Sequence, residues 1–440
     1  MPRVFHVSGA INYGAPGRIV EQIGLLAEKN GYECLVAHST RNENPSQLRH
    51  YAMTTRWQEV VHALGAKFLD LHGLLSTAQT ITLVERIKDY QPDIIHLHNI
   101  HGYFCNFKVL FEYLDSVDTP VVWTLHDCWS FTGRCFHFVG VDCYKWKTGC
   151  YDCKAEPSYT VSKYYDRSKE LYALKKRLFS SVKNLTLVPV SDWQAAFLKD
   201  SFLKDCNVHT IHNGVDIEKF RPMNGNRLRD KHKLDGKFVI LGVASPWNTR
   251  KGLDDFYRIR TMLSDEFAIV MVGLTSKQIE KLPDGIIGIE RTESQQELAE
   301  YYSMADVFVN LTYLDTFPTV NLEALACGTP IITYRTGGSP EAITDVENVK
   351  MVKDGIECYP TGMLVEQGDI AGIVDAIREL HAHLLSKEDC RKRAEIYFNK
   401  DKCFEKYIDL YNTLTCHTGG VKLYNPICCK SSCLERRLAA

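Results

Sequence analysis

Two carboxylates, Asp315 and Glu323, stand eight residues apart around a predicted helix start. Pro318 suits the first turn of that helix, Gly328 suits its end, and a short apolar strand follows. The next turn contains Gly337-Gly338, where the backbone must adopt a positive φ or approach another group closely. This order predicts carboxylates and free helix N–H groups at the carboxyl edge of a parallel sheet, where open α/β folds bind nucleotides.

Two cations, Arg250 and Lys251, follow a predicted strand at 239–243 and, with Gly252, open a helix. An ordinary basic helix start is the weaker interpretation, because the positive end of the helix dipole disfavours cations. Cations and helix N–H groups at such a place can bind a diphosphate and stabilise the charge that grows on it as it leaves. The sequence therefore predicts that this pair binds the phosphates of a nucleotide.

The composition is that of a globular chain of more than one domain. Its 440 residues are 45% hydrophobic and 24% charged, and the net charge of −2 gives no electrostatic case for binding nucleic acid. Apolar runs such as 267–274 are far shorter than the ~20 residues that span a bilayer. The N-terminus enters a strand without a signal-like apolar stretch, so we expect a cytoplasmic protein that touches a membrane surface at most.

Short apolar runs alternate with helix-period segments in both halves of the chain, which predicts parallel sheets covered on both faces. Predicted strands lie at 3–8, 33–37, 93–97, 121–125, 185–190, 208–211, 237–244, 268–272, 307–311 and 331–334. Predicted helices lie at 18–29, 78–90, 164–180, 253–263, 293–303, 370–383 and 403–414. A polar stretch with Pro and Gly at 220–230 is interpreted as the boundary between two domains.

The segment from Asp315 to Glu341 resembles the donor-binding segment of retaining glycosyltransferases of family four. That family carries two glutamates separated by seven residues, a Gly-Thr-Pro strand start and a Gly-Gly turn, and here Asp315 replaces the first glutamate. The resemblance implies the α/β fold called GT-B, with two facing Rossmann-like domains and a C-terminal helix that crosses back to the first domain. The implied parts are an acceptor domain at 1–219, a nucleotide-sugar domain at 220–398, a crossover helix at 399–415 and a tail at 416–440.

The same resemblance implies roles for individual residues. Glu323 is expected to bind the ribose hydroxyls and Asp315 the donor sugar. The family's counterpart of His126 lies beside that sugar, so we assign catalysis to His126, Asp315 and Glu323. The loop from Gly9 to Arg18 lacks the dinucleotide pattern Gly-x-Gly-x-x-Gly and resembles the family's glycine loop near the sugar and acceptor, with a plain glycine turn as the alternative. The further expected donor-binding residues are Gly14, Gly17, Thr319, Val320, Asn321, Gly337 and Gly338.

An insertion at 127–157 carries four cysteines and few aliphatic residues. Because such a loop would lack its own hydrophobic core, we predict one structural Zn²⁺ held by Cys135, Cys143, Cys150 and Cys153. A disulfide or simple reduced thiols are the alternatives. A similar insertion occurs in transferases that resemble colanic-acid-type enzymes. His96 and His98 are predicted to share one face of their strand, and a catalytic metal there is the weaker interpretation.

The resulting hypothesis is a retaining glycosyltransferase that moves a sugar from a nucleotide-sugar donor to a glycan or lipid-linked acceptor in surface polysaccharide biosynthesis. The enzyme would need no catalytic cofactor and would work in the cytoplasm or at the inner membrane face. A nucleotide-sugar epimerase of the same architecture and a non-catalytic nucleotide-sugar binding protein are the alternatives. The sequence does not name the base, sugar, acceptor or linkage.

Overall fold

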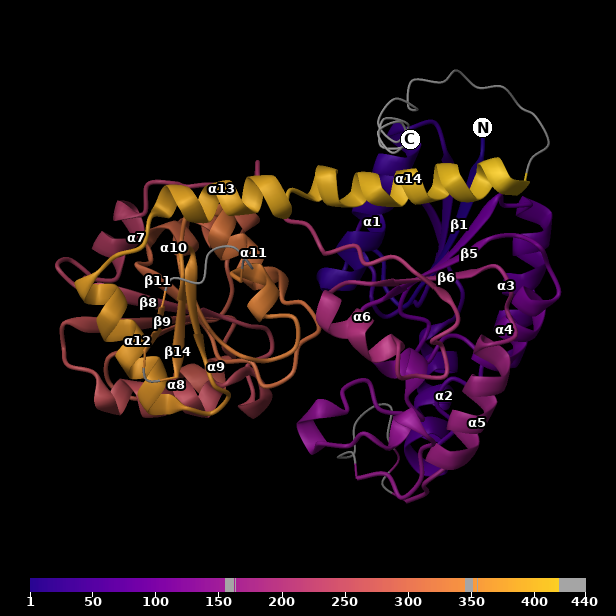
Figure 1. The fold of residues 1–440 in the computed structure, drawn as a ribbon, viewed down its shortest axis with the longest axis horizontal. Helices are drawn as coiled ribbons and strands as arrows, with labels where there is room; N and C mark the ends of the chain where they lie inside the picture. Colours follow the sequence, from indigo (N-terminus) through magenta and orange to yellow (C-terminus); the bar gives the residue numbers. More distant parts are fainter. Residues whose placement is uncertain (155–161, 163, 345–350, 354, 419–440) are drawn as a thin grey trace, which may run out of the picture.

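A computed structural model describes residues 1–154, 162, 164–344, 351–353 and 355–418. It contains two α/β domains, each with a sheet between layers of helices, and a long C-terminal helix that lies along the first domain (Figure 1). The predicted GT-B fold is therefore confirmed. None of the helices in the described ranges is long and apolar enough to cross a membrane.

The first domain contains a seven-stranded sheet in the order β3-β2-β1-β4-β5-β6-β7, with every strand parallel to its neighbours. The interior strand β5 is buried at all five positions, as expected for a parallel strand covered on both faces. The elements are β1 (Arg3–Ser8), α1 (Gly14–Lys29), β2 (Glu33–His38), β3 (Arg49–Ala52), α2 (Arg56–Leu69), α3 (Thr77–Tyr90), β4 (Ile94–Leu97), α4 (Phe107–Asp115), β5 (Val121–Leu125), α5 (Ser168–Phe179), β6 (Leu185–Pro189), α6 (Asp192–Leu198) and β7 (Asn207–Val208).

The second domain contains an eight-stranded sheet in the order β10-β9-β8-β11-β12-β15-β14-β13. The first six strands in this order, from β10 through β15, are parallel to their neighbours. Strands β14 and β13 then extend the sheet in antiparallel orientation. The elements are α7 (Asn226–Lys231), β8 (Phe238–Val243), α8 (Leu253–Met262), β9 (Phe267–Val272), α9 (Ser276–Ile279), β10 (Ile286–Ile289), α10 (Gln295–Met304), β11 (Val307–Asn310), α11 (Thr319–Ala326), β12 (Ile331–Tyr334), β13 (Met351–Lys353), β14 (Ile356–Tyr359), β15 (Gly362–Val365), α12 (Ile370–Ala382) and α13 (Lys387–Tyr397).

Both sheets reverse their strand order at one point, between β1 and β4 in the first domain and between β8 and β11 in the second. Ligands of doubly wound folds bind in the crevice beyond the carboxyl ends of the strands at such a point. The loops that follow β1, β8 and β11 are therefore the ones that position the site.

The C-terminal helix α14 (Lys400–Thr418) returns to the first domain, as the resemblance implied (Figure 1). Its inner side packs against α1 and the first sheet. The hydroxyl of Tyr411 lies 2.5 Å from His96 Nδ1, and the hydroxyl of Tyr407 lies 3.0 Å from Thr124 Oγ1. These contacts tie α14 to the centre of the first sheet.

One carboxylate joins the two domains beside the crevice. Glu341 of the second domain accepts hydrogen bonds from the backbone N–H groups of Asp192 and Trp193, at 2.9 and 2.7 Å, where α6 begins in the first domain. Glu341 Oε2 also lies 2.8 Å from His212 Nε2. A carboxylate at a helix start is electrostatically favourable, so these contacts help to set the relative position of the domains.

The structure corrects one expectation about the first domain and adds a helix that was not predicted. The insertion does have a hydrophobic core, because Phe131, Phe138 and Trp146 pack together with ring centroids 5.0–6.1 Å apart and join the core of the domain. Helix α2 was not among the predicted helices, and its large apolar side chains point outward. Residue type alone did not show which way these side chains face.

Candidate active site

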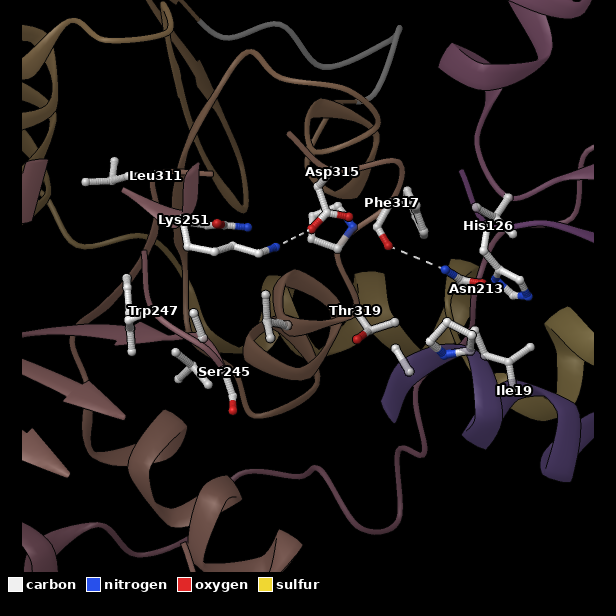
Figure 2. A pocket seen from close by; sticks show the side chains of 18 of the residues that line it. Ile19, His126, Asn213, Ser245, Trp247, Lys251, Leu311, Asp315, Phe317 and Thr319 are labelled. Atoms are coloured by element: carbon white, nitrogen blue, oxygen red, sulfur yellow. Dashed lines mark hydrogen bonds and ion pairs between the residues drawn. The ribbon is translucent and has the colours of Figure 1, made fainter. Parts of the chain in front are cut away.

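A cavity of about 290 Å³ lies between the domains, and side chains from both domains line it (Figure 2). Its first-domain wall includes Pro16 and Ile19 of α1 and His126, which directly follows β5. Its second-domain wall includes Lys251, from the segment after β8, and Asp315, from the loop after β11. Carboxyl ends of strands in both sheets therefore supply polar side chains to one space.

Lys251 and Asp315 form an ion pair in this cavity, with Lys251 Nζ 2.8 Å from Asp315 Oδ2 (Figure 2). Lys251 ends a short 3₁₀ turn, Thr249–Lys251, and the Asn248 side chain accepts a hydrogen bond from its backbone N–H at 3.1 Å. An ammonium group has three N–H donors, so Lys251 can keep its ion pair with Asp315 and still donate a hydrogen bond to a phosphate oxygen. The pair places both charges at the predicted donor site.

Arg250 lines a second cavity of about 180 Å³ that shares His126, Lys251 and Asp315 with the first. The carbonyl of Arg250 accepts a hydrogen bond from the Tyr313 N–H at 2.8 Å, which fastens the 3₁₀ turn to the loop carrying Asp315. The two adjacent cations thus face two adjoining spaces. The two cavities bring together six of the sequence-predicted residues, namely His126, Arg250, Lys251, Asp315, Thr319 and Val320.

His126 lines both of these cavities; the residue is half-buried, and its Nε2 atom is shielded from solvent. Burial lowers the pKa of His126 to about 4, so the imidazole is neutral near pH 7. Its Nε2 atom has no hydrogen-bond partner among the described residues. A buried polar atom without a partner beside a cavity is suited to bind a ligand group there.

Glu323 lies on α11 but does not line these cavities. Its side chain is 9% exposed, and Glu323 Oε2 accepts a hydrogen bond from the Tyr302 hydroxyl at 3.0 Å. Burial raises the pKa of Glu323 to about 7, although Tyr302 and the charge of Arg18 on α1 act in the opposite direction. The expected bond from Glu323 to the ribose stays a prediction.

The start of α11 contributes Thr319 and Val320 to the central cavity. Asn321 is instead buried beneath it, where its Oδ1 atom accepts a hydrogen bond from Asn310 Nδ2 at 2.8 Å. Asn310 lines the cavity, whereas Asn321 does not. The structure therefore makes Asn321 a support for Asn310, not a wall of the cavity.

The Gly337-Gly338 turn approaches protein backbone, not the cavity. Gly337 has φ +55°, and a Cβ atom there would lie 1.7 Å from the carbonyl oxygen of Asp315. The Gly338 N–H donates to the Thr316 carbonyl at 3.0 Å. The prediction of a close approach is right, but these glycines pack against the loop that carries Asp315, so donor contact is not their visible role.

The two predicted glycines of the N-terminal loop, Gly14 and Gly17, have different positions relative to the cavities. Gly14, at φ +62°, lines a third cavity of about 420 Å³ within the first domain. Gly17 is buried, and a Cβ atom on it would lie 3.1 Å from the Ala10 side chain. Gly17 therefore allows α1 to pack against the loop after β1, and it lines none of the three cavities described here.

The third cavity adjoins the central one, because Pro16 lines both. Glu59 of α2 is one of its polar residues, and this buried carboxylate accepts hydrogen bonds from Ser39 Oγ at 2.7 Å and from the Thr40 N–H at 2.9 Å. Arg41 lies opposite, with its Nε atom 3.3 Å from Glu59 Oε2. The sequence indicated the loop from Gly9 to Arg18, which lines this cavity, but not Glu59 and Arg41, because these two residues come from separate elements with no shared spacing.

A histidine–aspartate pair connects the two cavities. His101 lines the third cavity, and its Nε2 atom lies 2.6 Å from Asp127 Oδ2, next in sequence to His126. Burial favours the neutral acid, but the charge and hydrogen bond of His101 outweigh this and lower the pKa of Asp127. His96 and His98 lie behind this pair with ring centroids 4.0 Å apart, as their predicted shared face requires, and both are fully buried.

The four insertion cysteines, Cys135, Cys143, Cys150 and Cys153, are free thiols. Three clusters in the described ranges bring possible metal ligands within 4.8 Å of one another, and these cysteines are not among them. The zinc site therefore stays a prediction. The insertion also supplies His137 to the second cavity, beside Arg250 and Lys251, which the sequence gave no reason to expect.

Comparison with known proteins agrees with this architecture. Residues 17–219 match the domain described as Glycosyltransferase Family 4, and residues 237–383 match the domain described as Glycosyl transferases group 1. The putative colanic acid biosynthesis glycosyl transferase WcaC of Escherichia coli is 27% identical over 57% of this chain and 62% of its own length. The chain is therefore a glycosyltransferase of GT-B fold whose two domains match these two models.

Two further similarities are relevant. The N,N'-diacetylbacillosaminyl-diphospho-undecaprenol alpha-1,3-N-acetylgalactosaminyltransferase of Campylobacter jejuni is 29% identical over 36% of this chain. The match covers 44% of that relative, so the chain spans less than two thirds of the length of both relatives. The structure of HepE from Anabaena in complex with UDP superposes with a TM-score of 0.64 at 13% identity, covering 94% of this chain and all of that one, which shows a shared fold.

Proposed function

We propose that this chain transfers a sugar from a nucleotide-sugar donor to a glycan or lipid-linked saccharide and retains the anomeric configuration. The observation that carries the proposal is the meeting of Lys251, Asp315 and His126 in one cavity between the domains. The first two come from the second domain and the third from the first. Such a site is complete only when the domains face each other.

The donor diphosphate would lie against Lys251 and Arg250, near the start of α11. Both cations and the positive end of the helix stabilise the negative charge that grows on the diphosphate as its bond to the sugar breaks. Asp315 holds Lys251 in place and can accept a hydrogen bond from a sugar hydroxyl. These interactions strengthen as the leaving group acquires charge, which is what accelerates the reaction.

His126 would contact the transferred sugar. Because its imidazole is neutral and Nε2 has no protein partner in the described residues, it is available for a hydrogen bond. For retention, the acceptor oxygen attacks the face that the diphosphate leaves. The bond from the anomeric carbon to the phosphate oxygen breaks, the bond to the acceptor oxygen forms, and a phosphate oxygen takes the acceptor proton. No side-chain base is required for this step.

The acceptor would occupy the third cavity, which adjoins the central cavity at Pro16. Its charged and polar side chains, among them Glu59, Arg41 and Asn42, suit the hydroxyl groups of a saccharide. The relatives named for colanic acid biosynthesis and for a diphospho-undecaprenol-linked sugar support an acceptor of surface polysaccharide synthesis. A lipid carrier would bring the reaction to the cytoplasmic face of a membrane.

Turnover of the donor tests this proposal. A thermal-shift screen across UDP-, GDP-, ADP- and dTDP-sugars selects the donor, and NMR then follows the anomeric centre with saccharide acceptors. We expect an acceptor-dependent product with the donor's anomeric configuration. Conversion of the donor sugar without acceptor would indicate an epimerase, and an inverted product would refute the retaining mechanism. Binding without turnover across the acceptor panel would indicate a sugar-nucleotide sensor.

A further inference from the structure

Helix α2 carries a stripe of exposed apolar side chains. Trp57, Val61, Leu64 and Phe68 are 72%, 49%, 49% and 43% exposed. They are separated by four, three and four residues, which places them along one side of an α-helix. Helices on the surface of a soluble domain normally turn such a stripe toward the core. We call these four residues the α2 stripe.

The inward side of α2 is polar. Glu59 and His62 are both 1% exposed, and the hydrogen bonds of Glu59 to the third cavity's loops are described above. His62 Nε2 accepts a hydrogen bond from the Gly73 N–H at 3.1 Å. The amphipathic pattern of α2 is therefore inverted. The polar side of α2 packs against the first domain, and its apolar side is exposed on the surface.

The charges that α2 itself exposes have one sign. The other exposed side chains of α2 are Arg56, Lys67 and Leu69, and its single acidic residue, Glu59, is buried. Tyr164 extends the apolar surface, because its ring stacks on Phe68 with centroids 5.5 Å apart and is 61% exposed. Apolar and aromatic side chains flanked by basic ones are the composition that binds the interface of an anionic bilayer.

We propose that the α2 stripe docks on the surface of an anionic lipid bilayer. Charge complementarity favours lipid over a second copy of this chain, since a two-fold contact through the stripe would bring Arg56 and Lys67 of both copies together. Continuity with the acceptor cavity also favours lipid. Glu59, on the opposite side of the same helix, lines that cavity, so the cavity lies about one helix diameter, roughly 10 Å, from the docked surface.

Docking would therefore present the saccharide of a lipid-linked acceptor to the third cavity while its lipid stays in the bilayer. This link to the acceptor rests on the proposed function, whereas lipid binding itself does not. Vesicle binding by the protein without donor or acceptor thus tests the surface separately. Activity on a short water-soluble acceptor tests the transferase separately.

Vesicles of phosphatidylglycerol and phosphatidylcholine provide the assay. Trp57 is the most exposed of the chain's six tryptophans, all of which lie in described ranges, so it reports docking. We expect its emission to shift to shorter wavelength with anionic vesicles and to be quenched by brominated acyl chains. Co-sedimentation measures affinity. No sedimentation of the wild-type protein and no change in its emission would overturn the proposal.

Variants define the surface. Phe68→Asp is expected to weaken vesicle affinity about tenfold or more, and Lys67→Gln about fivefold on anionic vesicles only. Leu384→Asp is the matched control, because Leu384 is 65% exposed in the second domain and should have no effect. Melting temperature checks that each variant folds. Equal loss in Leu384→Asp, or a wild-type dimer that Phe68→Asp converts to a monomer without any loss of vesicle binding, would refute lipid docking by the stripe.

Discussion

Replacing Lys251 with alanine is expected to weaken binding of the donor's nucleoside diphosphate by roughly 1.5–3 kcal/mol. This range is that of one hydrogen bond to a charged group. It corresponds to about a ten- to 150-fold rise in Kd. The side chain is 35% exposed, which favours the lower half of the range because solvent screens the charge.

The ion pair complicates this substitution. Lys251 Nζ lies 2.8 Å from Asp315 Oδ2, so Lys251→Ala also removes the cation that pairs with this carboxylate. Asp315 would then repel the incoming diphosphate. A double-mutant cycle with Asp315→Asn separates the two effects. If Lys251 binds phosphate directly, Lys251→Ala still weakens binding in the Asp315→Asn background. If it serves only to neutralise Asp315, the loss disappears there.

Isothermal titration calorimetry with the nucleoside diphosphate chosen by thermal shift measures these affinities. Lys277→Ala is the matched control, because Lys277 is an exposed lysine of the same domain that does not line the cavity. It is expected to leave the affinity unchanged. An unchanged affinity in folded Lys251→Ala would remove Lys251 from the phosphate site and refute the reasoning.

Three other outcomes are expected. His126→Ala should lower kcat while nearly preserving affinity for the free nucleoside diphosphate, and equal loss of both in kinetics and calorimetry would make His126 structural. Glu323 has a folded-state pKa of about 7 against an ordinary 4.5, so its contribution to stability is present below pH 4.5 and is lost as the pH rises through 7. Between pH 5 and 8, denaturant titration should show the free energy of unfolding falling by up to about 3 kcal/mol relative to Glu323→Gln, and a constant difference would contradict this. Elemental analysis of reduced, tag-free protein should find one zinc per chain that is lost in Cys150→Ser, and clearly less zinc in the wild type would refute the metal site.

The sequence by itself determined the alternation of strands and helices, since that depends on local periodicity. β1 (Arg3–Ser8), β5 (Val121–Leu125) and β12 (Ile331–Tyr334) have the bounds that their apolar runs predict. The need for glycine at Gly337 was also local, because its φ of +55° excludes most side chains. Length and composition likewise indicated a globular chain of more than one domain.

Tertiary structure decided which of the motif's side chains reach the cavity. Asp315 and Glu323 are equally polar and lie eight residues apart, yet Asp315 pairs with Lys251 in the cavity while Glu323 is buried against Tyr302. The third cavity's Glu59 and Arg41 come together only through the packing of α2 and the loop after β2. Such positions depend on contacts between residues far apart in sequence, which local patterns do not encode.

The direction of amphipathic faces was the other property that only the folded structure decided. Helix α2 has an apolar stripe that would ordinarily predict a core face, but Glu59 and His62 already meet the domain through hydrogen bonds. The insertion shows the opposite: it was expected to lack a hydrophobic core, but its aromatic side chains are buried in the core of the first domain. Periodicity identifies a face, and only the surrounding elements determine whether that face is covered.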